Sequence, residues 1–422
     1  MSLLSLNESV ETPLETLPEA LVSFEVTDSP FSKFNLLPRV KLVLKYVQSY
    51  NYEGYDLFDG LNSPFLKSTV FYRSRYFRLA LIQFCKQSPV NLRPLLGVAR
   101  GFNPKGGALF LMGLIQLFEA YGEETYSNEA YILFQRLRHQ VQTRLIGNAW
   151  GYNFDWQARA FFVPEGTPNL VTSVFVGRAM LAYYRCFHDP QALELALGVT
   201  DFILSEMICH EDAHLLCFRY IPAKDTQVHN ANLLAASYLA ETLSFFSGNR
   251  ALMIRQKILK AVRFSVADIH PEGSWPYGTL SFHRWVDNFH TGFNIESLQT
   301  IQDCLQLDDF TAVLDSVIAY YLDHLFDDAG LPKYYSNHLY PVDVHVLAES
   351  IIILRLLREC GYPGKPVRRL LIEKSLIDLL VQFQDEAGYF YYQKLSRGWN
   401  KIPYIRWGQA WMFYALSGCL RP

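Results

Sequence analysis

One unit of about 60 residues recurs along most of this chain, and this repeat constrains the fold more than any other feature. Six stretches rich in small and aliphatic residues start at Lys105, Asn169, His229, Asn288, Val342 and Arg406. Their starts are 64, 60, 59, 54 and 64 residues apart. Because helices that are apolar on all sides are buried on all sides, these stretches predict six inner helices.

A more amphipathic helix is predicted between successive apolar ones, as in residues 193–207 and 251–269. A turn and a short run of alternating aromatic residues follow it, as in residues 148–157 and 386–404, which predicts a hairpin. Six units of outer helix, hairpin and inner helix predict an all-α (α/α)6 toroid. An open α-solenoid is the alternative, but its repeats are shorter and contain no hairpins.

The chain ahead of the repeat predicts little structure. Residues 1–35 are expected to form an extended, acidic lead-in, and residues 36–422 a single toroid domain. The first residues lack the basic start and apolar run of a signal peptide, and no stretch of 18 uninterrupted apolar residues occurs. Seven scattered cysteines without a CxxC pair favour a reducing compartment. We therefore expect a cytoplasmic protein with no membrane span.

The repeat also predicts where a ligand binds, because every hairpin precedes an inner helix and all hairpins should gather around one opening. The five segments expected there contain nine basic and six acidic residues, although the whole chain has a net charge of −3. Helix N-termini favour anions, and aromatic rings stack on sugars. A small-molecule or oligosaccharide ligand, expected to be anionic, fits better than nucleic acid. The alternative is that the rings only join hairpins to neighbouring helices.

Ten residues of the opening are predicted to bind this ligand. They are Asp155, Trp156, Arg159, His229, Tyr277, Arg284, Tyr391, Tyr404, Arg406 and Trp407.

Two pairs of residues are candidates for proton transfer. Asp287 and His290 stand at the start of one predicted inner helix, and Asp343 and His345 stand at the matching point of the next unit. A carboxylate beside a histidine is an arrangement that general acid–base catalysis uses. All four are therefore predicted catalytic residues, although each aspartate could serve only as a helix N-cap.

No metal or cofactor is predicted. Residues 210–214 read HEDAH and match the HExxH zinc motif, but that motif requires a helix, and the repeat aligns this segment with the turns that follow outer helices. No glycine-rich nucleotide-binding loop occurs. Lys105 is followed by Gly106 and Gly107, which indicates a close helix contact or, alternatively, an anion pocket.

Several segments resemble a bacterial exopolysaccharide-biosynthesis family, whose architecture is similar to that of six-hairpin glycosidases and N-acylglucosamine 2-epimerases. These segments are residues 55–64, 91–97, 150–162, 166–181, 285–298 and 406–416. The resemblance implies a glycan ligand and glycan-assembly proteins as partners. It places the aspartates of unsaturated-uronyl hydrolases on Asp155 and Asp287, and the paired histidines of epimerases on His290 and His345.

The first hypothesis is an enzyme of polysaccharide biosynthesis that hydrolyses, eliminates or epimerises a glycan. The alternatives are a glycan-binding scaffold without catalysis, and a cyclase of a lipid or other natural product. The sequence predicts no oligomeric state.

Overall fold

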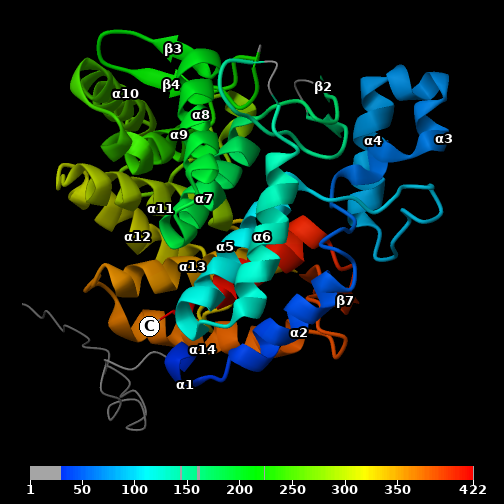
Figure 1. Cartoon of the computed structure of the whole chain (residues 1–422). Coiled ribbons are helices and arrows are strands. Elements are labelled where there is room, and N and C mark those ends of the chain that lie inside the picture. The colour runs from blue at the N-terminus through cyan, green and yellow to red at the C-terminus, as the bar shows by residue number, and fades with distance from the viewer. Residues whose placement is uncertain (1–29, 143–144, 159–161, 223, 422) are drawn as a thin grey trace, which may run out of the picture.

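The computed structural model describes residues 30–142, 145–158, 162–222 and 224–421, and six inner helices form a closed ring in it (Figure 1). They are α5 (Pro104–Tyr121), α7 (Leu170–Phe187), α9 (His229–Thr242), α11 (Asn288–Leu305), α13 (Val344–Glu359), and a π-helical turn (Ile405–Ala410) continued by α15 (Trp411–Gly418). Each helix packs against the next, and α15 packs back on α5. The predicted (α/α)6 toroid is confirmed.

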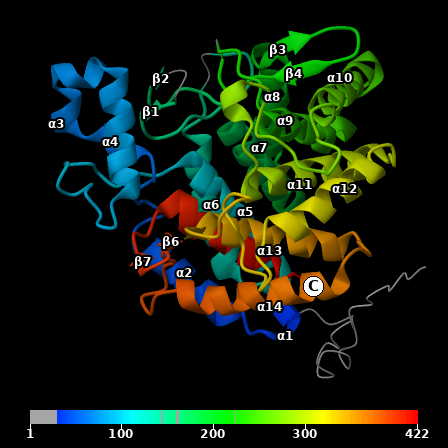
Figure 2. The ribbon, with the colours of Figure 1, turned by 180° about the vertical axis from the view of Figure 1, so that it is seen from behind.

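Six outer helices surround this ring. They are α2 (Leu37–Gln48), α6 (Glu124–Arg138), α8 (Pro190–Glu206), α10 (Gly248–Val266), α12 (Thr311–His324) and α14 (Pro366–Phe383). Each of the last five packs on the inner helix that precedes it, whereas α2 packs on α15. The early and late parts of the chain therefore close the ring together (Figure 2).

Burial explains which helices lie inside. Every residue of α9 except Glu241 is buried, whereas α8 buries one stripe that includes Ala192, Ala196 and Ile203. Small residues let inner helices approach closely: a Cβ on Gly177 would lie 2.5 Å from the Tyr238 hydroxyl. The apolar pattern of the sequence thus separates the two layers.

Short antiparallel hairpins gather near the N-terminal ends of the inner helices. The strands are β1 (Trp156–Gln157) with β2 (Phe162–Val163), β3 (Ile208–Glu211) with β4 (Leu216–Phe218), and β5 (Val342–Asp343) with β6 (Gln393–Lys394) and β7 (Trp399–Asn400). The segment before α11 differs from the prediction, because it contains a 3₁₀ turn over Ser281–His283. The HEDAH segment ends β3 and enters a turn, so it lacks the helix that a zinc motif needs.

The expected lead-in is not extended throughout. Helix α1 (Pro30–Lys33) lies within it and packs on α14, and Phe31 is buried in the core. Burial of this one ring explains the helix that the sequence pattern did not indicate. Residues 1–29 of the predicted lead-in lie outside the described part of the chain.

A helical excursion replaces the hairpin between α2 and α5. It contains α3 (Pro64–Lys67), α4 (Arg75–Gln87) and two 3₁₀ turns, Asp59–Asn62 and Val70–Arg73. Figures 1 and 2 show α3 and α4 standing out from the ring at one corner. Of the helices in the described ranges, none has the length and apolar character needed to cross a membrane.

Candidate active site

A central pocket of about 190 Å³ lies among the N-terminal ends of the inner helices. An adjoining cavity of about 320 Å³ shares Trp156, Tyr220, Tyr277 and His290 with it. The described residues that line the central pocket are mostly aromatic, but they include Lys105, Asn230, His290, His345 and Arg406. No aspartate or glutamate is among these lining residues.

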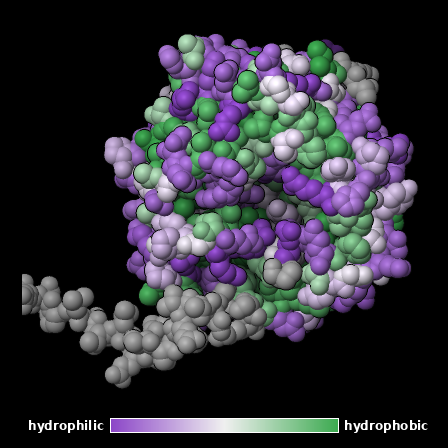
Figure 3. All heavy atoms as spheres, turned by 60° about the vertical axis from the view of Figure 1, so that its left-hand side comes forward, coloured by the Kyte–Doolittle hydropathy of each residue, from purple (hydrophilic) through white to green (hydrophobic). Residues whose placement is uncertain are grey.

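A larger cavity of about 810 Å³ opens elsewhere, beside the C-terminal end of α11 and the turn before α14. Figure 3 shows this side of the molecule, with a hollow bordered by hydrophilic side chains. Among the described residues, its lining contains no histidine, no lysine and no residue of the hairpins. The central pocket is the better candidate because it brings several titratable side chains together.

The first histidine of the pocket is held by an aspartate. Asp287 caps α11: its Oδ1 accepts a hydrogen bond from the backbone N–H of His290 at 2.9 Å. Its Oδ2 lies 2.7 Å from His290 Nδ1 and 3.1 Å from Trp285 Nε1. His290 Nδ1 carries a proton and donates it in a hydrogen bond to this carboxylate. The lone pair on His290 Nε2 is therefore available to act as a base.

The second histidine has no such support. His345 is buried, with its ring stacked on Phe289 and Trp411 at centroid distances of 4.8 and 4.6 Å. Neither ring nitrogen has a hydrogen-bond partner in the described residues. Burial, followed by the charges of Lys105, Arg406 and His290, lowers the pKa of His345 well below its usual value. It is therefore a neutral imidazole near pH 7 that a ligand can satisfy.

Asp343 lies next to this histidine in sequence but does not bond its ring in the structure. It caps α13 through the backbone N–H of His345 at 2.9 Å. It also accepts from Gln393 Nε2 at 2.8 Å and from Trp407 Nε1 at 2.9 Å. Burial raises the pKa of Asp343 to about 6. Both carboxylate oxygens are thus occupied by structural hydrogen bonds.

Lys105 brings an amine to the floor of the pocket. Its Nζ lies 4.2 Å from the ring centre of Phe175 and 4.9 Å from that of Trp411. Burial, followed by the charge of Arg406, lowers the pKa of Lys105 well below its usual value. Gly106 packs closely, since a Cβ there would lie 3.4 Å from Arg406 Cβ. The helix contact that the sequence suggested is therefore present beside a pocket-lining lysine.

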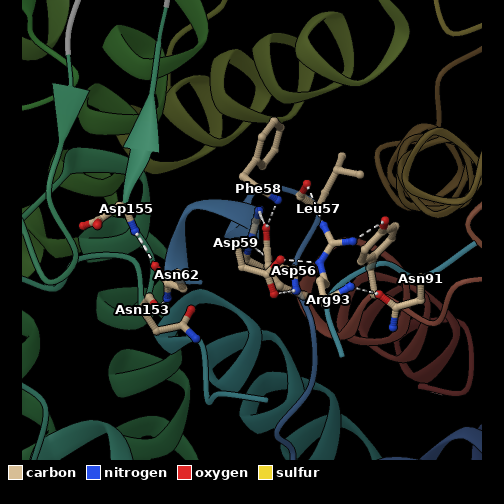
Figure 4. A network of polar contacts seen from close by, with 11 residues as sticks. Asp56, Leu57, Phe58, Asp59, Asn62, Asn91, Arg93, Asn153 and Asp155 are labelled. Carbon is tan, nitrogen blue, oxygen red and sulfur yellow. Dashed lines mark hydrogen bonds and ion pairs between the residues drawn. The ribbon is translucent and has the colours of Figure 1, made fainter. Parts of the chain in front are cut away.

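An aspartate of the helical excursion holds Arg406 in place. Asp56 accepts from Arg406 Nε at 2.7 Å and from Nη2 at 2.8 Å. Figure 4 shows the network behind this pair, in which Arg93 contacts Asp59 and donates to the Leu57 carbonyl. Burial raises the pKa of Asp59 to about 6, although the charge of Arg93 opposes that rise. The excursion thus fixes one pocket cation through a buried carboxylate.

Six predicted residues meet in the central pocket: Trp156, Tyr277, His290, His345, Arg406 and Trp407. Asp287 and Asp343 lie directly behind it. Arg159 lies outside the described residues.

Five other predicted residues do not line the pocket, because each is engaged by a neighbour. Asp155 bonds Tyr72 and Lys67, His229 bonds Asp268 and Ser265, Arg284 bonds Asp268, Tyr391 bonds Asp385, and Tyr404 accepts from Arg93. For His229 the cause is helix register: its ring faces α10, and the next residue, Asn230, faces the pocket.

Sequence reasoning missed Phe58 as a pocket residue and Asp56 as the partner of Arg406. Both lie in the 55–64 segment, some 350 positions before Arg406, and no periodic pattern connects the two. As for metals, the described residues contain no group of three histidine, cysteine or acidic side chains suited to an ion.

Several solved structures with the same toroid are named as carbohydrate-active proteins. One is the cellobiose 2-epimerase from Spirochaeta thermophila DSM 6192, at 16% identity, TM-score 0.57, covering 76% of this chain and 86% of that one. A GH76 α-mannanase from Bacteroides thetaiotaomicron has 10% identity, TM-score 0.54 and coverages of 74% and 85%. A structure of UGL with dGlcA-Glc-Rha-Glc has 14% identity, TM-score 0.59 and coverages of 91% and 94%.

These similarities establish the fold alone. No protein-family model and no curated protein sequence matches the chain.

Proposed function

We propose that this protein is a sugar-converting enzyme that moves a proton at a carbon atom next to a carbonyl group, as an epimerase or isomerase does. The observation that carries the proposal is a pocket lined by two histidines and, among the described residues, by no carboxylate. Glycoside hydrolysis usually needs two carboxyl groups on either side of the bond that breaks. Asp287 and Asp343 do not meet this need, because hydrogen bonds occupy their oxygens.

The two histidines are close enough to serve one sugar. Both rings contact Phe289, with centroid distances of 4.1 Å for His290 and 4.8 Å for His345. His290 Nε2 accepts the proton from carbon, and the electron pair of the C–H bond moves toward the carbonyl oxygen. His345, as a neutral imidazole, donates a hydrogen bond to this oxygen, and Lys105 and Arg406 stabilise the oxygen as it becomes negative. The imidazolium of His290 then returns a proton to carbon, and the electron pair returns from the oxygen, which completes the change.

Two supports come from beyond the pocket. The cellobiose 2-epimerase named above has this fold, and the segments that resemble the exopolysaccharide-biosynthesis family suggest a role in polysaccharide biosynthesis. Lys105 lines the pocket and has no ion-pair partner among the described residues, which favours a substrate with an anionic group.

Deuterium exchange tests the proposal. Purified protein is incubated in D₂O with a panel of reducing monosaccharides, disaccharides and uronic acids, and NMR follows both the C2 proton and new anomeric signals. We expect deuterium at C2 together with a second epimer or a ketose. Hydrolysis without deuterium incorporation would overturn the proposal in favour of a glycosidase, and an unsaturated product would indicate elimination. Sugar binding without any turnover would indicate the scaffold alternative.

A further inference from the structure

The helical excursion carries a surface unlike the rest of the molecule. Seven large apolar side chains there are between 62% and 80% exposed: Phe65, Val70, Phe71, Tyr76, Phe84, Val90 and Leu95. Elsewhere in the described chain, Ile146 is the one other large apolar side chain in this range. Exposed apolar side chains gathered in one small region indicate a contact surface, whereas scattered ones do not.

Beyond the buried Asp59, the charged residues of this region are all basic. Residues 60–100 contain seven lysines and arginines and no aspartate or glutamate, in a chain whose net charge is −3. Arg73, Arg75 and Arg100 are exposed. Within the described ranges, no carboxylate lies within ion-pair distance of Arg73 or Arg100. The region is therefore cationic as well as apolar.

We propose that this apolar–basic surface, formed by the seven apolar residues with Arg73, Arg75 and Arg100, docks the protein on an anionic lipid bilayer. Aromatic and aliphatic side chains enter the interface between headgroups and acyl chains, while arginines pair with lipid phosphates. The strength of binding increases with the buried apolar area and with the electrostatic attraction to anionic lipids, and the excursion supplies both. A partner protein with an acidic groove would account for the basic residues of this surface. It would not require the exposed rings that lie on two helices and their flanking turns.

The position of the surface gives the docking a consequence for the pocket. Lys67 Nζ lies 3.0 Å from Asp155, and Arg78 Nε donates to Gln157 at 2.8 Å. These contacts fasten the excursion to strand β1, whose Trp156 lines the pocket. Docking would hold this side of the pocket toward the bilayer. The inference does not depend on the chemistry proposed above.

Vesicle co-sedimentation of the full chain tests the docking. We expect roughly tenfold more protein on phosphatidylcholine–phosphatidylglycerol vesicles than on phosphatidylcholine alone, and less binding at high salt. Phe71→Ser/Tyr76→Ser and Arg73→Gln/Arg75→Gln should each remove most of this binding. The matched control is Ile132→Ser/Leu252→Ser, which changes two exposed apolar residues on outer helices and should bind like the wild type. Circular dichroism and thermal midpoints confirm that each variant is folded.

Two results would overturn the inference. One is equal binding of wild type and both surface variants to anionic vesicles, or no preference of the wild type for them. The other is a wild-type dimer in light scattering that Phe71→Ser/Tyr76→Ser converts to a monomer without any change in vesicle binding, which would make this surface an interface between copies of the chain.

Discussion

Two helix starts in consecutive repeat units contain the same residue types and yet form different sites. At α11, Asp287 caps the helix and also bonds the ring of His290. At α13, Asp343 also caps its helix, but its carboxylate bonds Trp407 and Gln393 and leaves the ring of His345 without a partner among the described residues. One histidine is oriented by a carboxylate, and the other is clamped between aromatic rings.

A single residue of spacing accounts for the difference. His290 is the third residue after its cap, where a side chain turns back toward the capping residue. His345 is the second residue after its cap, the position that Phe289 occupies in α11, and these two rings stack at 4.8 Å. Equivalent positions of the ring therefore point toward one centre, and the residue type placed there decides the chemistry.

Removal of either imidazole should have the largest effect. His290→Gln and His345→Gln are each expected to lower C2 proton exchange by about 10²–10⁴-fold, because a positioned acid or base contributes that much. NMR exchange rates in D₂O measure the effect. The control is His214→Gln, an exposed histidine in a turn, which should exchange at the wild-type rate. Full activity of one variant would show that its histidine takes no part in the exchange.

Matched substitutions of the two aspartates should have different effects on the rate of C2 proton exchange. Asp287→Asn keeps an oxygen for the cap but turns an N–H toward His290 Nδ1, which disfavours the tautomer with a free Nε2, and exchange should fall by roughly 10²-fold or more. Asp343→Asn touches no histidine ring, and its exchange rate should stay within about threefold of wild type. Equal losses in both variants would contradict the difference between the two helix starts.

Stability should depend on pH through Asp343. Its pKa is raised from 3.8 to about 6 in the folded protein, so the folded state binds the proton more tightly than the unfolded chain. Its contribution to stability is therefore lost as pH rises from 3.8 to about 6. Urea unfolding measures this loss. As pH rises across this window, the free energy of unfolding of the wild type, relative to that of Asp343→Asn, should fall by up to about 3 kcal/mol.

His345→Gln is the opposite control for this measurement. The folded pKa of His345 is depressed, so its contribution is present above the usual value of 6.5 and is lost as pH falls below it. The free energy of unfolding of the wild type, relative to that of His345→Gln, should thus fall as pH is lowered. The same sign for both variants would contradict the assigned protonation states.

The smallest expected effect concerns the lysine at the pocket floor. Lys105→Met removes a positive charge that lowers the pKa of His345, so that pKa should rise by less than about one pH unit. Ring resonances of labelled histidine followed by NMR report the titration. Lys86→Met, which changes a lysine that acts on Asp343, should leave the titration of His345 unaltered. A fall in the His345 pKa on loss of Lys105 would be inconsistent with the placement of its amine.

The sequence determined the ring. Its six apolar stretches, separated by amphipathic ones, predict inner helices wrapped by outer helices. This periodic pattern also placed His290, His345, Arg406 and Trp407 near one opening. It did not indicate α1, which depends on the burial of Phe31, or the helical excursion, which breaks the repeat.

Only the tertiary structure decided which polar residues face the ligand. His229 bonds Asp268 on the outer side of its helix, and Tyr404 bonds Arg93. Asp56, from the early part of the chain, bonds Arg406 in the last inner helix. Such choices depend on helix register and on contacts between residues hundreds of positions apart. A pattern of local spacing contains neither, and so the sequence locates the opening while the packing of the ring selects its chemistry.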